Sequence, residues 1–249
     1  MAEPLLSVIG LVKRFGGLIA TNGLDLNVAR GETHALIGPN GAGKTTLVGQ
    51  LQGEITPDAG RILFAGREVT YEPAHRRAAH GIARSFQISS VFPDFTASAN
   101  VGMAVQARLG HSFRFFRPTQ EDAAIIQPAL EALALIGLDH RAHVLARDLS
   151  HGERRQLELA MALAMRPMLL LLDEPLAGMG RQDGERMTTI LGGLKQHYTI
   201  LLIEHDMDAV FALADRVSVL VSGRAIATGS PADIRADPEV RSAYLGGKH

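Results

Sequence analysis

Two groups of residues in this 249-residue chain have the types and the spacing that nucleotide chemistry requires. The first is the glycine-rich segment GPNGAGKTT, in which Gly38, Gly43, Lys44 and Thr45 fit the pattern G-x-x-x-x-G-K-[ST]. Glycines let backbone N–H groups turn toward phosphates, and the N-terminus of the following helix adds favourable dipole charge. Lys44 is expected to reach the β and γ phosphates, and the Thr45 hydroxyl is expected to ligate Mg²⁺. The residues expected to bind the nucleotide are Gly38, Asn40, Gly41, Gly43, Lys44, Thr45 and Thr46.

The second group is an acidic pair that follows the strongest apolar run of the chain. Met168–Leu172 is strand-sized and leads directly into Asp173 and Glu174. A buried strand delivers such carboxylates to its C-terminal edge, where open α/β sheets bind their ligands. We expect Asp173 to hold Mg²⁺ through water, and Glu174 to be the general base that polarises the attacking water. The alternative is a pair of solvated acids at a strand end, which the phosphate loop disfavours.

A third feature is the segment LSHGE at Leu149–Glu153. Ser150 is a favourable N-cap residue, and Glu153 stands three positions later, as in a capping box. The residues alone leave two interpretations open. One is a capped helix without a ligand, and the other is a helix N-terminus that binds an anion.

The apolar pattern indicates the elements that must position these residues. Strands are predicted at Leu5–Ile9, Thr33–Ile37, Arg61–Phe64, Ile82–Phe86, Met168–Leu172, Thr199–Ile203 and Val217–Val221. Helices are predicted at Lys44–Leu51 and Glu153–Met165, and at two sets with helical spacing: Ile126, Leu130, Leu133 and Ile136, then Met187, Ile190, Leu191 and Leu194. Strands buried on both faces and alternating with helices predict an α/β fold with a mainly parallel sheet. The helical stretch 88–148 interrupts this alternation, so we expect one domain, 1–249, with an inserted α-helical subdomain.

The composition narrows the classes of protein. A formal net charge of −1 gives no argument for a nucleic-acid partner, and the lack of cysteine excludes a disulfide scaffold and cysteine metal sites. The N-terminus lacks the pattern of a signal peptide. No run approaches the roughly 20 apolar residues that span a bilayer. We therefore expect a soluble chain that acts on a membrane only through a partner.

Taken together, the phosphate loop, LSHGE and the strand ending in Asp173 resemble the ATPase subunits of ABC transporters in order and spacing, over essentially the whole chain. The resemblance implies a P-loop NTPase core with an N-terminal β region, and ATP and Mg²⁺ as cofactors. In that family the signature of one subunit binds the γ-phosphate of ATP held by the phosphate loop of another. Ser150 and Gly152 take this role by resemblance. One loop and one signature per chain imply a head-to-tail pair.

Three more site residues enter by the same resemblance. Phe15 matches an aromatic residue that stacks on adenine. Gln87 matches the glutamine that touches Mg²⁺ and reports to the membrane partner. His205, in IEHDM, matches the switch histidine that contacts the γ-phosphate and supports hydrolysis. The implied catalytic set is Glu174, His205 and Gln87, and the implied metal set is Thr45, Gln87 and Asp173.

The chain departs from the common LSGGQ signature at His151 and Glu153, two positions at which the family tolerates change. A third departure is Gly180, which stands where the family often has an aspartate that helps couple the two subunits. We therefore do not assign Gly180 a catalytic role.

ARSFQ, DEPLAGM, IEHDM and the terminal ADPEVRSAYLG resemble ATPases of importers for branched-chain and other hydrophobic amino acids. The implied partners are transmembrane permease subunits, a second ATPase that is an identical or related chain, and indirectly a periplasmic binding protein. The implied location is the cytoplasmic face of the cell membrane. Residues 91–103 lie near where such ATPases receive the coupling helix of the permease. The basic, aromatic segment His111–Pro118 is expected to be a solvated loop.

Four alternatives stay open. A urea or short-amide importer ATPase shares the LSHG form, and a lipopolysaccharide exporter ATPase shares the acid-Arg-Arg pattern of Glu153–Arg155. A soluble ABC protein usually joins two cassettes or carries a long coiled coil. A generic phosphate-loop kinase would need neither a signature nor a partner.

Overall fold

Three apolar runs form the buried centre of the main β-sheet, as their composition predicts. They are β3 (Thr33–Ile37), β7 (Leu169–Asp173) and β8 (Thr199–Ile203), and every residue in them is buried. The computed structural model describes residues 3–85, 91–110 and 122–242. It places the three strands in a six-stranded sheet of order β10-β9-β3-β8-β7-β6. Gln87 and the segment 111–118 lie outside the described residues.

The six-stranded sheet is parallel except at one edge. β6 (Ile82–Ser85), β7, β8, β3 and β9 (Arg216–Val221) run parallel, and β10 (Arg224–Gly229) pairs antiparallel with β9. The carboxyl ends of the parallel strands therefore meet at one edge, which is where such sheets bind ligands. The expected α/β fold with a mainly parallel sheet is confirmed.

A second, antiparallel sheet of order β2-β1-β4-β5 is formed by strands from the first 70 residues. Its strands are β1 (Leu6–Phe15), β2 (Leu18–Val28), β4 (Ala59–Phe64) and β5 (Arg67–Glu68). β1 is longer than the predicted Leu5–Ile9, and β2 was not predicted. Both differences have one cause, since polar or exposed residues on the outer face of this sheet interrupt the apolar pattern.

Helices cover the sheets. They are α1 (Lys44–Gln52), α2 (Ala74–Ala79), α3 (Ala97–Leu109), α4 (Ala123–Leu135), α5 (His151–Ala164), α6 (Arg181–Leu194), α7 (Met207–Leu213), α8 (Pro231–Ala236) and α9 (Pro238–Val240), with 3₁₀ turns η2 (Asp139–Arg141) and η3 (Ala146–Asp148). α1, α5 and α6 lie where the apolar spacing predicts them. In α4, Ile126 and Leu130 are only half-buried, because alanines shift the buried face to Ile125, Ala129, Ala132 and Leu133.

Alternate residues of the central strands face two different cores. Leu170 and Leu172 of β7 pack with the core of α3 to α6, whereas Leu169 and Leu171 pack with α1 and the antiparallel sheet. Burying such a leucine contributes about 1.5–3 kcal/mol. β7 is thus held from both sides, which fixes the position of Asp173 at its end.

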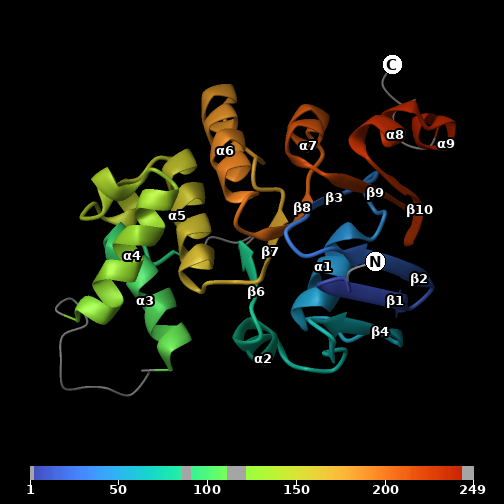
Figure 1. Cartoon of the computed structure of the whole chain (residues 1–249), viewed down its shortest axis with the longest axis horizontal. Helices are drawn as coiled ribbons and strands as arrows, with labels where there is room; N and C mark the ends of the chain where they lie inside the picture. The colour runs from blue at the N-terminus through green and yellow to red at the C-terminus, as the bar shows by residue number, and fades with distance from the viewer. Residues whose placement is uncertain (1–2, 86–90, 111–121, 243–249) are drawn as a thin grey trace.

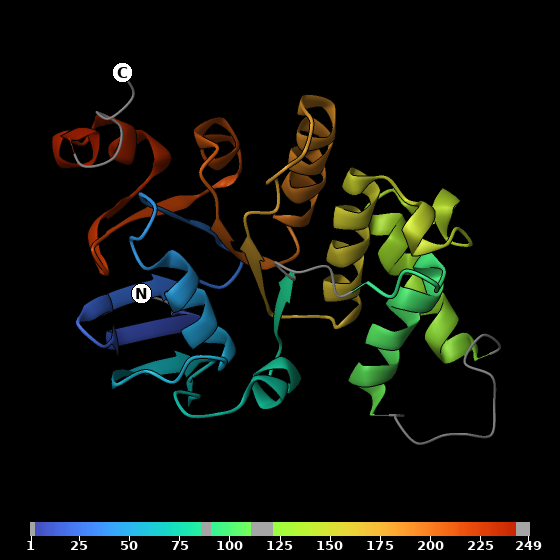
Figure 2. The same ribbon diagram turned by 180° about the vertical axis from the view of Figure 1, so that it is seen from behind.

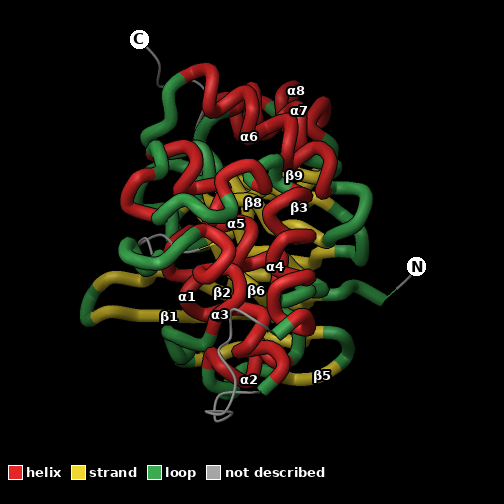
Figure 3. Tube along the Cα trace, turned by 90° about the vertical axis from the view of Figure 1, so that its left-hand side faces the viewer, coloured by secondary structure: helices red, strands yellow, loops and turns green. Residues whose placement is uncertain are grey.

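The views show how these parts are arranged. In Figure 1, α3, α4 and α5 lie at one end of the molecule, β6 and β7 lie between α5 and α1, and α8 and α9 lie at the opposite end. Figure 2 shows the same order from behind. Figure 3 views the molecule from the end that carries α3 to α5, with the strands behind these helices. None of the helices in the described ranges has both the length and the apolar character needed to cross a membrane.

Candidate functional site

The phosphate loop lies so close to neighbouring backbone that two of its positions have room only for glycine. Gly38 and Gly43 have φ angles of 155° and 104°. A Cβ atom at Gly38 would lie 2.1 Å from the carbonyl oxygen of Leu220, and one at Gly43 would lie 2.1 Å from the carbonyl oxygen of Ala20. Both distances are shorter than any real contact of this kind, so a side chain is excluded at either position. The two motif glycines are therefore required by the fold itself.

Lys44 begins α1 and its side chain turns back over the loop. Its Nζ donates hydrogen bonds to the carbonyl oxygens of Gly38, at 2.6 Å, and Pro39, at 3.0 Å. Burial lowers the pKa of Lys44, and the negative charges of Glu174 and Asp173 oppose that shift. The ammonium group of Lys44 therefore interacts electrostatically with the carboxylates of Glu174 and Asp173. The other predicted nucleotide ligands on the loop are accessible, with Asn40, Gly41 and Thr45 exposed and Thr46 half-buried.

Asp173 ends β7 as a nearly buried carboxylate. Only 2% of its side chain is exposed, and its Oδ2 accepts a hydrogen bond of 2.8 Å from Nη2 of Arg84. Burial raises the pKa of Asp173, while the positive charge of Arg84 opposes this. Arg84 was not predicted as a site residue. The sequence places it in ARSFQ, three residues before Gln87, but does not show which carboxylate it meets.

Glu174 follows Asp173 with a left-handed backbone and a far more exposed side chain. Its φ is 50°, and its N–H donates to the carbonyl oxygen of Ile203 at 2.8 Å. Such a conformation costs a non-glycine residue about 1–3 kcal/mol and concentrates at functional sites. The side chain is 41% exposed, and its Oε1 lies 3.9 Å from Nδ1 of His205. The structure therefore brings together Lys44, Asp173, Glu174 and His205.

Glu204 is a buried carboxylate that sequence reasoning missed. Its Oε1 accepts the N–H of Leu176, and its Oε2 accepts the N–H groups of His205 and Asp206, at 2.9, 2.9 and 3.3 Å. Only 1% of its side chain is exposed. It thus connects the turn after Glu174 to the segment that carries His205. The available signal was an acid that directly follows an apolar run and precedes a histidine.

The LSHGE segment forms a capping box. The N–H of Glu153 donates to Oγ of Ser150 at 3.2 Å, and the N–H of Ser150 donates to Oε2 of Glu153 at 2.8 Å. Arg141 also pairs with Glu153, at 2.8 Å, and with the Ser150 N–H it helps to lower the pKa of that carboxyl. Glu153 stands where the common signature has glutamine, and here it completes the cap of α5.

Gly152 lies against the end of the exposed Asp183 side chain, near the start of α6, and a larger residue there would have to displace that side chain. A Cβ at Gly152 would lie 2.7 Å from the carboxyl carbon of Asp183. Ser150 and His151 are exposed beside it. α5 and α1 lie on opposite sides of β6 and β7 in Figures 1 and 2, so one chain does not bring this segment to its own phosphate loop.

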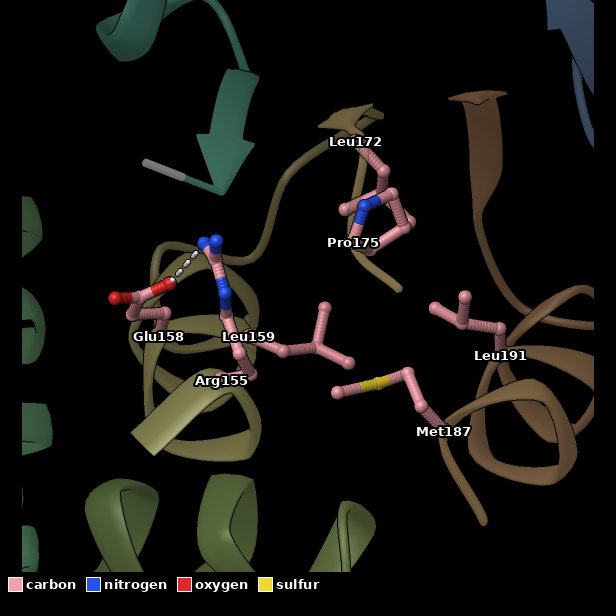
Figure 4. Close-up of a pocket in the computed structure, with 7 residues that line it drawn as sticks. All are labelled: Arg155, Glu158, Leu159, Leu172, Pro175, Met187 and Leu191. Atoms are coloured by element: carbon pink, nitrogen blue, oxygen red, sulfur yellow. Dashed lines mark hydrogen bonds and ion pairs between the residues drawn. The ribbon is translucent and has the colours of Figure 1, made fainter. Parts of the chain in front are cut away.

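Apolar side chains of α5 and α6 pack against the C-terminal end of β7. Figure 4 shows Leu159, Met187 and Leu191 facing Leu172 and Pro175, the residues on either side of the acidic pair. These residues line a small pocket together with Arg155 and Glu158, and Nη1 of Arg155 lies 3.1 Å from Oε2 of Glu158. The position of the acidic pair thus depends on the packing of both helices.

Phe15 lies at the end of β1, before the turn to β2. Its ring is 49% exposed, and Nζ of Lys13 lies 5.6 Å from the ring centroid. An exposed aromatic ring of this kind has a face available for stacking. Its predicted role toward adenine stays a prediction.

Known proteins resemble the chain over its whole length. The family model for ABC transporters matches residues 21–177, and the model for branched-chain amino acid ATP-binding cassette transporters matches residues 226–249. The chain is 37% identical to the high-affinity branched-chain amino acid transport ATP-binding protein BraF of Pseudomonas aeruginosa, over 99% of both chains. It is 38% identical to the corresponding protein LivG of Escherichia coli strain K12, again over 99% of both chains.

A solved structure gives the same result for the fold. The ADP conformation of MJ1267, an ATP-binding cassette of an ABC transporter, matches with a TM-score of 0.86 and 27% identity, and the match covers 98% of this chain and 100% of that chain. The core expected from the phosphate loop, the acidic strand end and LSHGE is therefore confirmed. The chain belongs to the ABC transporter family and is an ATP-binding, ATP-hydrolysing subunit of a membrane transporter.

Proposed function

We propose that this chain powers the import of branched-chain amino acids. The observation that carries the proposal is the match to BraF and LivG over 99% of each chain, together with the separate match of residues 226–249 to the branched-chain amino acid model. The sequence similarity extends beyond the ATPase motifs to the C-terminal segment. That segment includes α8 and α9, which are remote from the phosphate loop in Figure 1.

We propose that hydrolysis takes place between two ATPase subunits arranged head to tail. Lys44 and the loop hold the phosphates of ATP, and Glu174 polarises the attacking water, with His205 beside it. Ser150 and Gly152 of the other subunit contact the γ-phosphate. The separation of α5 from α1 within one chain supports this arrangement, since each chain then supplies half of a site. Phe15 stacks on adenine.

The side-chain oxygens of Thr45, in α1, and of Asp173, at the end of β7, are of the kind that Mg²⁺ binds. Thr45 offers an exposed hydroxyl, and Asp173 offers a carboxylate of which only Oδ2 is used by a protein partner among the described residues. Mg²⁺ prefers oxygen ligands and is usually held by one or two protein groups together with substrate phosphates. Bound there, the ion would neutralise charge on the phosphates. Gln87 completes the proposed metal set.

We further propose how the chain is organised around its partners. Residues 88–148 form a helical subdomain within the single domain 1–249, and its described part contains α3, α4, η2 and η3. Permease subunits dock on this side, near residues 91–103. The second ATPase is an identical or related chain. The assembly lies at the cytoplasmic face of the membrane and receives its solute from a periplasmic binding protein.

The test uses the variant Glu174→Gln, which keeps the shape of the side chain and removes the base. We expect it to bind ATP, to lose turnover by at least about a hundredfold, and to stay associated with its partners. Purification from detergent-solubilised cells with ATP and Mg²⁺ should yield two permeases and an ATPase pair, and cells carrying the variant should lose leucine uptake. Normal leucine uptake together with lost ATPase activity would refute the substrate, whereas full ATPase activity would refute the role of Glu174.

A further inference from the structure

Arg84 reaches the acidic end of β7 from the neighbouring strand. β6 and β7 run parallel, with Arg84 opposite Leu171 in the register. Nη2 of Arg84 donates to Oδ2 of Asp173 at 2.8 Å, and 10% and 2% of the two side chains are exposed. Water and salt therefore screen this pair much less than a surface pair.

The second terminal nitrogen of the Arg84 guanidinium group, Nη1, contacts the end of α1, the helix that follows the phosphate loop. Nη1 of Arg84 donates to Oε1 of Gln52 and lies 3.6 Å from Oε2 of Glu54. Gln52 is the last residue of α1, the helix that begins at Lys44. Arg84 thus connects three parts of the nucleotide site: the end of α1, strand β6 and the carboxylate of β7.

The geometry leaves one oxygen of Asp173 for a second cation. Arg84 uses Oδ2, and no other hydrogen bond from the described residues reaches this carboxylate. One carboxylate oxygen suffices for Mg²⁺ when nucleotide phosphates supply further ligands. A divalent ion that arrives without ATP meets a carboxylate whose charge Arg84 already balances, so it gains little by binding.

We propose that Arg84 is the resident counter-cation of Asp173, a positioning residue that holds this carboxylate in place and makes divalent-metal binding depend on nucleotide. The inference rests on the proposed role of Asp173 in the metal site. The burial of Asp173 agrees with it: only 2% of this side chain is exposed, so removing the arginine leaves a poorly solvated carboxylate in need of another cation.

The test measures Mn²⁺ binding to the nucleotide-free protein by the electron paramagnetic resonance signal of free Mn²⁺. We expect Arg84→Gln, which keeps a hydrogen-bond donor without the charge, to bind Mn²⁺ at least about tenfold more tightly than the wild type. Arg84→Lys restores the charge and should return the affinity to the wild-type value. Arg61→Gln is the matched control, because Arg61 forms an exposed pair with Glu68 at 2.8 Å.

Further variants separate the possible failures. The double variant of Arg84→Gln with Asp173→Asn should lose the gained Mn²⁺ affinity. Unchanged Mn²⁺ affinity in Arg84→Gln would overturn the proposal, provided that Asp173→Asn still weakens Mg²⁺-dependent ATP binding. If Asp173→Asn leaves that binding intact, the metal role of Asp173 is itself wrong. If Arg84→Gln does not fold, Arg84→Met takes its place, because it also removes the charge; tighter Mn²⁺ binding is again expected, and unchanged affinity would overturn the proposal.

Discussion

The N–H of Leu176 donates a hydrogen bond to Glu204 across 28 positions of sequence, with 2.9 Å between the nitrogen and Oε1. The other oxygen of Glu204 accepts the N–H of His205 at 2.9 Å. One buried carboxylate therefore fixes the backbone on both sides of the gap between Glu174 and His205. The 3.9 Å distance between those two side chains depends on this connection.

Replacing Glu204 by alanine should disturb both segments. An N–H left without an acceptor costs about 1–3 kcal/mol when it is buried. The three N–H groups here are partly buried, so the free energy of unfolding should fall by about 1–3 kcal/mol in all, and ATP turnover should fall with it. Glu204→Gln keeps one acceptor and should lose less. Urea unfolding and steady-state ATPase assays check this. The control is Glu185→Gln, whose side chain is 65% exposed. Wild-type stability in Glu204→Ala would show that the connection is unimportant.

Lys44→Ala should weaken the binding of ATP itself. A charge-assisted hydrogen bond to phosphate contributes about 1.5–3 kcal/mol, which corresponds to a loss of affinity of roughly tenfold or more. Titration with a fluorescent ATP analogue measures the change. Lys195→Ala provides the control, because Lys195 pairs with Asp215 at 2.5 Å on another part of the surface. An unchanged dissociation constant in Lys44→Ala would contradict the predicted phosphate contact.

Two substitutions of Ser150 separate its capping role from a contact with nucleotide. Ser150→Ala removes the cap and should cost about 1 kcal/mol of stability. Ser150→Asp keeps a good N-cap but places negative charge where the γ-phosphate of the opposite site is expected, so stability should be retained and turnover lost.

The chain contains a matched control for this experiment. Ser230 caps α8 in the same way, with Asp233 in the place of Glu153. Ser230→Asp should leave turnover close to the wild type and lower stability slightly, because Oγ of Ser230 lies 2.6 Å from Oδ2 of Asp233. Undiminished turnover in Ser150→Asp would leave LSHGE as a plain helix cap.

Stability should fall in acid because of a buried polar chain that includes Glu32. Nδ1 of His34 lies 3.0 Å from Glu32, Nε2 lies 2.8 Å from Ser218, and Ser218 lies 2.7 Å from Thr228. Burial tends to raise the pKa of Glu32. Hydrogen bonds from His34 and from the N–H of Ala29, together with the charges of His34 and Arg216, outweigh it, so the net pKa lies below its ordinary value of 4.5.

The sign of the pH effect follows from that direction. A carboxyl whose pKa is lower in the folded state stabilises the fold above its unfolded pKa, and this contribution disappears as the pH falls through the folded value. We expect thermal unfolding of the wild type to shift downward below pH 4.5. Glu32→Gln should show a smaller shift over the same range. Equal shifts in the two proteins would exclude Glu32 as the source.

Features that depend on adjacent residues were predictable from the sequence. The loop after β3, the start of α1, the acidic end of β7 and the Ser150–Glu153 capping box all follow from local spacing, and each lies where it was expected. Periodicity also found the strands buried on both faces. It did not find β10, none of whose residues is buried. It also missed β2, although Leu24, Leu26 and Val28 alternate there with exposed polar residues, a signal that the sequence does contain.

Contacts between distant segments were not predictable. The sequence shows that Arg84 and Glu204 are charged residues next to apolar runs, which is also true of many surface residues. Only the parallel register of β6 with β7 brings Arg84 to Asp173, and only the left-handed turn at Glu174 brings Leu176 to Glu204. Such partners depend on the tertiary fold, which residue types and spacing do not specify.

Gly38 lies close to Leu220, and Gly43 lies close to Ala20. In each of these pairs, replacing the glycine has a different effect on the contact from replacing its neighbour. The atoms nearest to the glycines are main-chain carbonyl oxygens, which every amino acid possesses. Substitution of Leu220 or Ala20 therefore leaves the contacting oxygen in place, whereas any substitution of the glycine adds an atom where there is no room. At these two points the geometry for binding phosphate therefore depends on the main chain of β9 and β2 and on the absence of a side chain at the two glycines.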